Sequence, residues 1–161
     1  MSEDPALLLT LEWLGAKRRH VIGTLDGLAE ADVRRSVLPS GWSLLGAVHH
    51  LAVDVERFWL RAVVGGEDVT FPDDEAWETT GSLGVAEVVE LYRAESAAGD
   101  AVLRTRAALD PLAWWPEGLD SAPYASVHEV LHHVLVETAT HAGHLDVVRE
   151  LIDGHQRLVL T

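Results

Sequence analysis

Residues 126–154 read SVHEVLHHVLVETATHAGHLDVVRELIDG and carry the clearest helix signals in the chain. Ser126 and Glu129 have the Ser-x-x-Glu spacing of a capping box, and Asp153-Gly154 provides a stop. Between these signals, apolar residues recur at three- and four-residue steps, as in an amphipathic helix. We therefore predict one long helix that begins at Ser126 and stops at Asp153-Gly154.

Three upstream segments have the same helical periodicity and are separated by helix breakers. They run from Pro5 to about Ala29, from a cap at Ser40 or Ser43 to the Gly65-Gly66 stop, and from near Ser82 to just before Asp110-Pro111. No alternating pattern typical of a strand persists for more than a few residues. Four helices in 161 residues predict an all-α four-helix bundle, in a single domain over residues 1–161.

Two connections, residues 67–82 and 110–125, are long and rich in Pro, Trp and acidic residues. They are too long for tight hairpins, so at least one of them is expected to cross the bundle. Long loops of this kind often form the rim of a binding site. Their tryptophans would line a pocket mouth or pack over the end of the bundle: Trp77, Trp114 and Trp115.

Composition excludes several classes of function. There is no cysteine, so disulfides, thiolate metal sites and cysteine nucleophiles are absent, and His, Asp and Glu remain as metal ligands. The net charge of −14 and the scattered basic residues argue against nucleic-acid binding. No apolar run is long enough to span a membrane, and the acidic N-terminus has no signal-peptide pattern. We therefore expect a cytoplasmic protein.

A strip of polar residues follows one face of the helix predicted after Ser126. At about 100° per residue, His133, His141 and His144 all lie within about 40° of Glu137. Apolar residues flank this strip: Val130, Val134, Leu145 and Val148. The strip is therefore predicted to face the bundle interior. Burying a carboxylate and several imidazoles there would cost several kcal/mol of desolvation free energy unless they are paired or bind a metal. An exposed Glu137–His141 pair is the alternative.

The second helix supplies a candidate third ligand, His50, in an otherwise core-like segment. A packed histidine is the alternative for this residue. Two histidines and a glutamate would leave one metal position open for water or substrate, as in catalytic sites. Asp54, one turn later, is a weaker candidate for a fourth ligand or a base. Arg57 could meet an anionic substrate or form a surface ion pair.

The remaining two histidines of the strip take a different role in this prediction. His144 lies about 10 Å along the helix axis from Glu137, so it is too far along to be a ligand of the same ion. We expect His144 and His133 to contact the ligand side chains or the substrate.

These residues resemble the DinB-like family of metal-binding four-helix bundles, over nearly the whole chain. The second helix has the family's Trp-Ser, a histidine eight residues after the tryptophan, and then Glu and Trp, at Trp42, His50, Glu56 and Trp59. Residues 133–150 match His-x-x-x-Glu-x-x-x-His-x-Gly-His-x-Asp-x-x-Arg-Glu. This variant is similar to the branch that contains the N-terminal domain of the mycothiol-dependent maleylpyruvate isomerase.

The resemblance implies a divalent metal on His50, Glu137 and His141, with zinc expected first and nickel, manganese or iron as alternatives. It also implies a metal-dependent S-transferase whose partners are a low-molecular-weight thiol such as mycothiol and a small electrophile. Relatives often pair, so a homodimer is an expectation too. A non-catalytic, metal-stabilised bundle that acts as a stress-related or binding module is the alternative, and a bundle without metal is a third.

Overall fold

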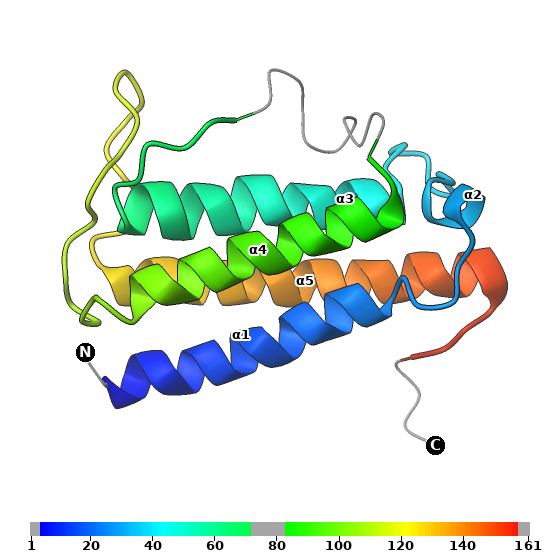
Figure 1. Cartoon of the computed structure of the whole chain (residues 1–161), viewed down its shortest axis with the longest axis horizontal. Coiled ribbons are helices and arrows are strands. Elements are labelled where there is room, and N and C mark those ends of the chain that lie inside the picture. The colour runs from blue at the N-terminus through cyan, green and yellow to red at the C-terminus, as the bar shows by residue number, and fades with distance from the viewer. Residues whose placement is uncertain (1–3, 72–82, 158–161) are drawn as a thin grey trace.

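The computed structural model describes residues 4–71 and 83–157, and every regular element within them is a helix. The elements are α1 (Pro5–Gly23), α2 (Glu30–Val33), α3 (Leu44–His50), η1 (Leu51–Val64), α4 (Val85–Leu103) and α5 (Val127–Asp153). α3 runs directly into η1, so four long columns form the molecule and α2 is a short turn at one end (Figure 1). The predicted all-α four-helix bundle is confirmed.

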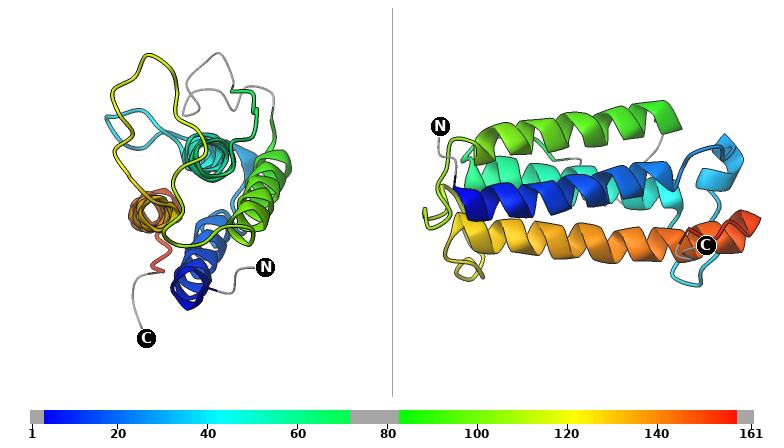
Figure 2. Two further views of the ribbon diagram at one scale, coloured as in Figure 1. Left: turned by 90° about the vertical axis from the view of Figure 1, so that its left-hand side faces the viewer. Right: turned by 90° about the horizontal axis from the view of Figure 1, so that it is seen from below.

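α1 and α5 lie side by side and run in the same direction, opposite to α3–η1 and α4 (Figures 1 and 2). Near the C-terminal ends of α1 and α5, Arg149 Nη1 donates to the carbonyl of Thr24 at 2.8 Å. Gly65, after η1, packs against Val102 near the end of α4. The chain must therefore return along the bundle between η1 and α4. A crossing connection was predicted for residues 67–82, and residues 72–82 of it, including Trp77, lie outside the described part of the chain.

The predicted limits of α5 are confirmed. Ser126 Oγ accepts a hydrogen bond from the backbone N–H of Glu129 at 3.4 Å, which caps the first turn. At the other end Gly154 has φ +77°, and its N–H donates to the Glu150 carbonyl at 2.8 Å. A left-handed residue at this position favours glycine, so the Gly154 stop has a backbone cause.

α1 and α4 end earlier than the periodicity predicts, at Gly23 and Leu103 instead of near residues 29 and 109. Both ends are followed closely by a threonine whose hydroxyl donates to a carbonyl three residues back. Thr24 Oγ1 lies 2.6 Å from the Val21 carbonyl, and Thr105 Oγ1 lies 2.7 Å from the Val102 carbonyl. Such local bonds compete with helix continuation, which apolar periodicity alone does not show.

The second column changes helix type at His50. From Leu51 to Val64 it is a π-helix, and the backbone N–H of Gly65 still reaches five residues back to Leu60, at 3.1 Å. Wide π turns are frequent at functional sites. Here the change of helix type begins directly after a predicted metal ligand, so it sets the angle at which the following side chains leave the column.

An ion-pair network passes through the centre of the bundle. Arg18 of α1 donates from Nε and Nη2 to the two carboxylate oxygens of Glu56 on η1, both at 2.7 Å, and from Nη1 to Asp100 of α4 at 2.7 Å. The side chain of Glu56 is fully buried, and burial raises its pKa while Arg18 opposes the rise. Buried Tyr92 lies near the same charges. The bonds of Arg18 to Glu56 and Asp100 thus fix α1, η1 and α4 relative to one another. Removing one partner of the buried Arg18–Glu56 pair would leave an uncompensated buried charge, which is strongly destabilising.

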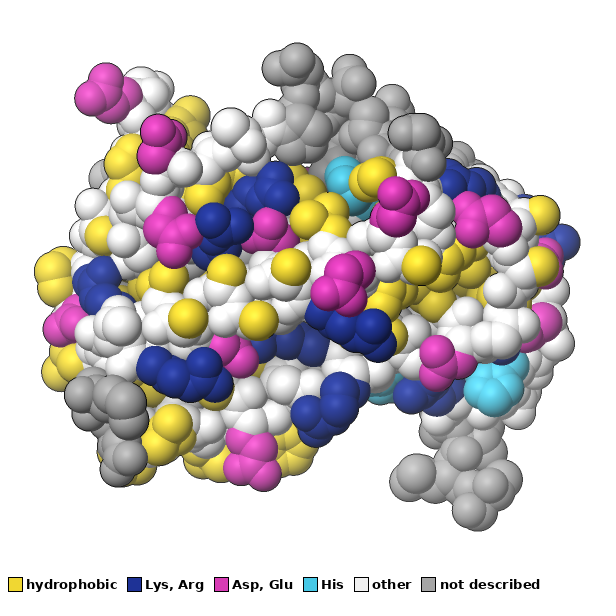
Figure 3. Space-filling view, in the orientation of Figure 1, with side chains coloured by type: hydrophobic (Ala, Val, Ile, Leu, Met, Phe, Trp, Pro, Cys, Tyr) yellow, Lys and Arg dark blue, Asp and Glu magenta, His cyan; other side chains and the backbone are white. Residues whose placement is uncertain are grey.

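The surface carries charges of both signs. On the face shown in Figure 3, basic side chains lie among acidic ones and do not gather in one patch. No helix in the described ranges is long and apolar enough to cross a membrane.

Large apolar side chains are exposed on the neighbouring helices α1 and α5: Leu8, Leu9, Trp13, Val136, Val147 and Leu151. Homodimerisation stays a prediction.

Candidate metal centre

The three predicted ligands lie together between the second column and α5. His50 is the last residue of α3, and Glu137 and His141 occupy successive turns of α5. One donor atom from each of the three lies within 4.8 Å of the other two. Nε2 of His141 is 3.4 Å from a carboxylate oxygen of Glu137, and the rings of His50 and His141 are 5.2 Å apart. Two imidazoles and one carboxylate are a donor set that suits zinc and related divalent metals.

The imidazole of His50 is oriented by a carboxylate one turn away. Asp54 Oδ2 lies 2.7 Å from Nδ1 of His50. An ionised carboxylate only accepts hydrogen bonds, so Nδ1 carries the hydrogen, and in the neutral imidazole Nε2 then keeps its lone pair. A carboxylate behind a histidine is the usual arrangement around a metal-binding imidazole. The residues present therefore fit a metal ion.

The cluster is half-buried and remains open on one side. The side chains of His50 and His141 are 15% and 14% exposed, whereas that of Glu137 is 37% exposed. Burial lowers the pKa of His141, and the neighbouring His50 lowers it further, while Glu137 acts in the opposite direction. The neutral imidazole is the form that binds a metal. The lowered pKa therefore favours the neutral form of His141.

One family model, described as mycothiol-S-transferase, matches residues 9–154. This range includes the second, third and fourth columns in full, all of α1 except its first four residues, and the three clustered side chains. The chain belongs to the mycothiol-S-transferase family. No curated protein and no solved structure gives a significant match. The resemblance to the DinB-like bundles, including their mycothiol-using branch, is thereby confirmed.

In this family member the polar strip of α5 lies at the edge of the bundle and faces η1, whereas the sequence predicted an inward orientation. Glu137 is partly exposed and His144 is exposed. The residues of α5 that are fully buried, such as Val134, Thr138 and Leu145, lie on one side of the strip only. These residues turn one side of α5 toward the core and place Glu137 at the boundary between core and solvent. The donor atoms can therefore contact both the second column and solvent.

His144 lies beyond His141, toward solvent. Their ring centroids are 5.7 Å apart, and the ring of Trp42 is 6.5 Å from that of His144. Trp42 is half-buried, just before the cap of α3 at Ser43. The exposed imidazole and the indole therefore form one wall beside the cluster.

His133 lies on the other side of the cluster, one turn before Glu137. Its ring contacts Trp59 at 4.7 Å and Tyr124 at 5.1 Å between centroids. Burial lowers the pKa of His133, while Glu137 opposes the shift. Sequence reasoning did not select Tyr124, although its place just before the Ser126 cap puts it beside the first turns of α5.

Arg57 forms an ion pair, the alternative that the sequence offered to a substrate contact, but its partner Glu95 is buried and not on the surface as expected. Its Nη2 lies 2.7 Å from Glu95, and its Nη1 donates to the Thr70 carbonyl at 2.9 Å. Arg61 donates to the second oxygen of Glu95 at 2.8 Å. Burial alone would raise the pKa of Glu95, but the two guanidinium groups outweigh it and lower that pKa. Glu95 was also missed from sequence, since its partners are on another helix.

The tryptophans of residues 110–125 pack against the end of η1. Trp115 lies 5.8 Å from Trp59 between ring centroids, and its Nε1 donates to the Asp120 carbonyl at 2.7 Å. Trp114 lies 6.4 Å from Phe58 and is 41% exposed. Because Trp59 also contacts His133, the packing of Trp115 on Trp59 helps to hold the aromatic side chains beside the candidate centre in place.

Proposed function

We propose that this member of the mycothiol-S-transferase family is a divalent-metal-dependent enzyme that transfers a low-molecular-weight thiol, such as mycothiol, to a small electrophile. The family match supports thiol S-transfer. The observation that carries the metal dependence is the set of three donors within 4.8 Å of one another, at His50, Glu137 and His141. Three protein ligands leave an open position, which a catalytic site needs.

Zinc is the metal we expect, with nickel, manganese or iron as alternatives, because imidazole and carboxylate donors suit all of them. When bound, such an ion stabilises the thiolate form of a thiol and so provides a strong nucleophile at neutral pH. One carboxylate and two neutral imidazoles leave net positive charge on a divalent ion, which favours an anionic sulfur as the further ligand.

The chain's own side chains would hold and orient the reactants. Asp54 fixes the ring of His50, while Trp42 with His144 and Trp59 with His133 offer aromatic walls on two sides of the cluster. During transfer, the thiol sulfur forms a bond to the electrophilic carbon as that carbon's bond to the leaving group breaks. The leaving group keeps the electron pair, and the thiol proton passes to solvent at the exposed edge beside His144.

A non-catalytic, metal-stabilised bundle that serves as a stress-related or binding module is the second candidate. The packing of Trp115 on Trp59, which in turn contacts His133 beside the cluster, is the observation that favours it, since a loop packed close to a metal centre restricts access to it. The exposed edge of Glu137 favours the enzyme. Both candidate functions predict that the protein binds a metal. Only the enzyme predicts catalytic turnover.

The metal is tested by elemental analysis of the purified protein and of His50→Ala, Glu137→Ala and His141→Ala variants. We expect bound metal in the wild type and its loss in all three variants. His155→Ala is the matched control, because His155 is an exposed histidine beyond the C-terminal end of α5 and outside the cluster. Stoichiometric metal that survives the three substitutions would overturn the ligand assignment.

The reaction is tested by following loss of mycothiol with monochlorobimane as the electrophile, using metal-loaded protein. We expect turnover that His141→Ala abolishes and His155→Ala preserves. Glutathione in place of mycothiol measures how far the thiol is selected. Metal-loaded protein that accelerates no S-transfer with a panel of thiols and electrophiles would support the binding module instead.

A further inference from the structure

A second pair of histidines lies on the first turns of α5. His128 and His132 enclose Glu129 in the sequence His-Glu-Val-Leu-His. In a helix this His-Glu-x-x-His spacing places both imidazoles on one face, and in zinc hydrolases it supplies two metal ligands. The pair is separate from the residues assigned to thiol transfer.

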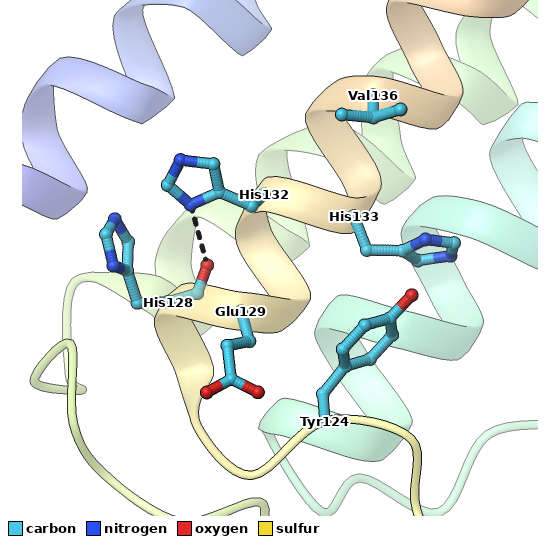
Figure 4. Close-up of a pocket in the computed structure, with 6 residues that line it drawn as sticks. All are labelled: Tyr124, His128, Glu129, His132, His133 and Val136. Carbon is cyan, nitrogen blue, oxygen red and sulfur yellow. Dashed lines mark hydrogen bonds between the residues drawn. The ribbon is translucent and has the colours of Figure 1, made fainter.

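The two rings are already close together. Their centroids are 4.4 Å apart, with 76° between the ring planes. Figure 4 shows both rings on the same side of α5, projecting away from the helix. They line a hollow of about 480 Å³, to which Tyr124, Glu129, His133 and Val136 also contribute. His132 is exposed and His128 is half-buried, so water could reach an ion held between them.

The hydrogen bonding of His132 leaves one nitrogen ready to bind a metal. Its Nδ1 lies 3.1 Å from the backbone carbonyl oxygen of His128 (Figure 4). A carbonyl oxygen can only accept, so Nδ1 carries the hydrogen, and in the neutral imidazole Nε2 then keeps the lone pair. A metal-binding histidine usually has its other nitrogen bonded in this way, often to a backbone carbonyl.

This pair cannot share an ion with the first cluster. His132 lies five residues before Glu137, about 7.5 Å along the helix axis and about 140° around it. Within the described part of the chain, three potential ligands gather at one place only, around His50. The pair on the first turns of α5 would therefore hold an ion with two imidazoles and water.

The middle glutamate of the motif is used for helix capping. Glu129 Oε2 accepts a hydrogen bond from the backbone N–H of Ala125 at 2.9 Å, while its own N–H donates to Ser126 Oγ. In a zinc hydrolase this glutamate is the general base. Because Glu129 is bound to the helix N-terminus, the geometry supports metal binding without peptide hydrolysis.

We propose that His128 and His132 form a second, weaker binding site for a nitrogen-preferring divalent transition metal such as zinc, nickel or copper, completed by water. Imidazole nitrogen suits these metals, whereas magnesium and calcium prefer oxygen ligands. Magnesium is therefore not expected to bind to the pair. Filling this site would tie the first two turns of α5 together at the edge of the hollow.

The proposal is tested by titrating Zn²⁺ into the His50→Ala/His141→Ala variant of the full chain, in which the first cluster has lost two donors. We expect one zinc per chain. A further His132→Ala or His128→Ala substitution is expected to weaken that binding at least about tenfold, since even the loss of an outer hydrogen-bond partner costs 10–100-fold in metal affinity. Copper binding followed by electron paramagnetic resonance should show two nitrogen ligands.

Two controls separate the pair from other sources of zinc binding. His155→Ala should leave the affinity unchanged, and Glu129→Gln should retain zinc while lowering helix stability. If the His50→Ala/His141→Ala variant is unfolded, the same substitutions are made in the wild type, where the weaker zinc site fills after the stronger one. The proposal would be overturned if no second, weaker zinc site were found, or if that site survived both His128→Ala and His132→Ala.

Discussion

Asp54 Oδ2 lies 2.7 Å from Nδ1 of His50, so a carboxylate of the π-helix fixes the imidazole that ends α3. The contact spans the point where the helix widens. It connects a local change of backbone geometry with the orientation of the His50 ring. Asp54 is therefore expected to act through His50, and its substitution tests that role directly.

Asp54→Ala should lower metal affinity by about 10–100-fold, the usual cost of losing the hydrogen-bond partner of a ligand histidine. Asp54→Asn should cost less, because its carbonyl oxygen can still accept from Nδ1. Competition with a chelator of known affinity measures both. Glu12→Ala, an exposed helical carboxylate on α1, is the control and should change nothing. Equal affinities for Asp54→Ala and Glu12→Ala would remove Asp54 from the site.

Removing the metal should destabilise the wild type. An ion that binds only the folded state adds about 2.7 kcal/mol when it is present at 100 times its dissociation constant. Thermal unfolding with zinc and then with excess chelator measures the difference as a shift in Tm. The shift should largely disappear in His50→Ala/His141→Ala. A shift that persists at full size there would place the stabilising ion elsewhere.

Local sequence signals predicted where helices begin better than where they end. Ser126 is a cap in the structure as predicted, and Ser43 is the cap of the two serines offered for the second helix, since a cap depends on atoms about three residues away. The ends of α1 and α4 depend on Thr24 and Thr105, whose hydroxyls bind carbonyls of the last turn. Apolar periodicity continues past both points, so it could not reveal the stops.

The candidate site also has one part that local sequence spacing predicted and another part that it did not. The spacing of Glu137 and His141 along one helix placed them on one face, and the structure adds His50 at the predicted place. Contacts between columns were not predictable, because their register depends on packing across the whole bundle. The position of Tyr124 against His133 and the pairing of Arg57 with Glu95 are of this kind.

Arg18→Met should cost about 3–5 kcal/mol, because it leaves the carboxylate of fully buried Glu56 without its partner. Arg19→Met, the same change at the adjacent exposed arginine, should cost little. Adding Glu56→Leu to Arg18→Met should recover most of the loss, since it removes the unpaired buried group. Urea unfolding measures all three. A double variant no more stable than Arg18→Met would show that the pair is not the source of the loss.

Two helical glycines should respond oppositely to alanine. A Cβ on Gly99 would lie 2.8 Å from Cδ1 of Leu60, where α4 packs closely on η1, so Gly99→Ala should cost about 1–3 kcal/mol. A Cβ on Gly143 meets nothing within 4 Å, so Gly143→Ala should gain up to about 1 kcal/mol from helix propensity. Chemical unfolding measures both. A stabilising Gly99→Ala would mean that the two helices are farther apart than described.

Glu95 should make the stability depend on acid pH. Burial alone would raise its pKa, but Arg57 and Arg61 outweigh burial, so the folded-state pKa lies below the ordinary 4.5. The unfolded chain therefore takes up the proton first, and the stability from this carboxylate is present above 4.5 and is lost as pH falls through the folded-state value. Glu95→Gln should thus cost about 1–3 kcal/mol at neutral pH, and the gap to wild type should narrow in acid. Urea unfolding across this pH range measures the gap, with Glu90→Gln, an exposed glutamate on the same helix, as control. A gap that stays constant as Glu95 becomes protonated would show that packing, and not its charge, stabilises the fold here.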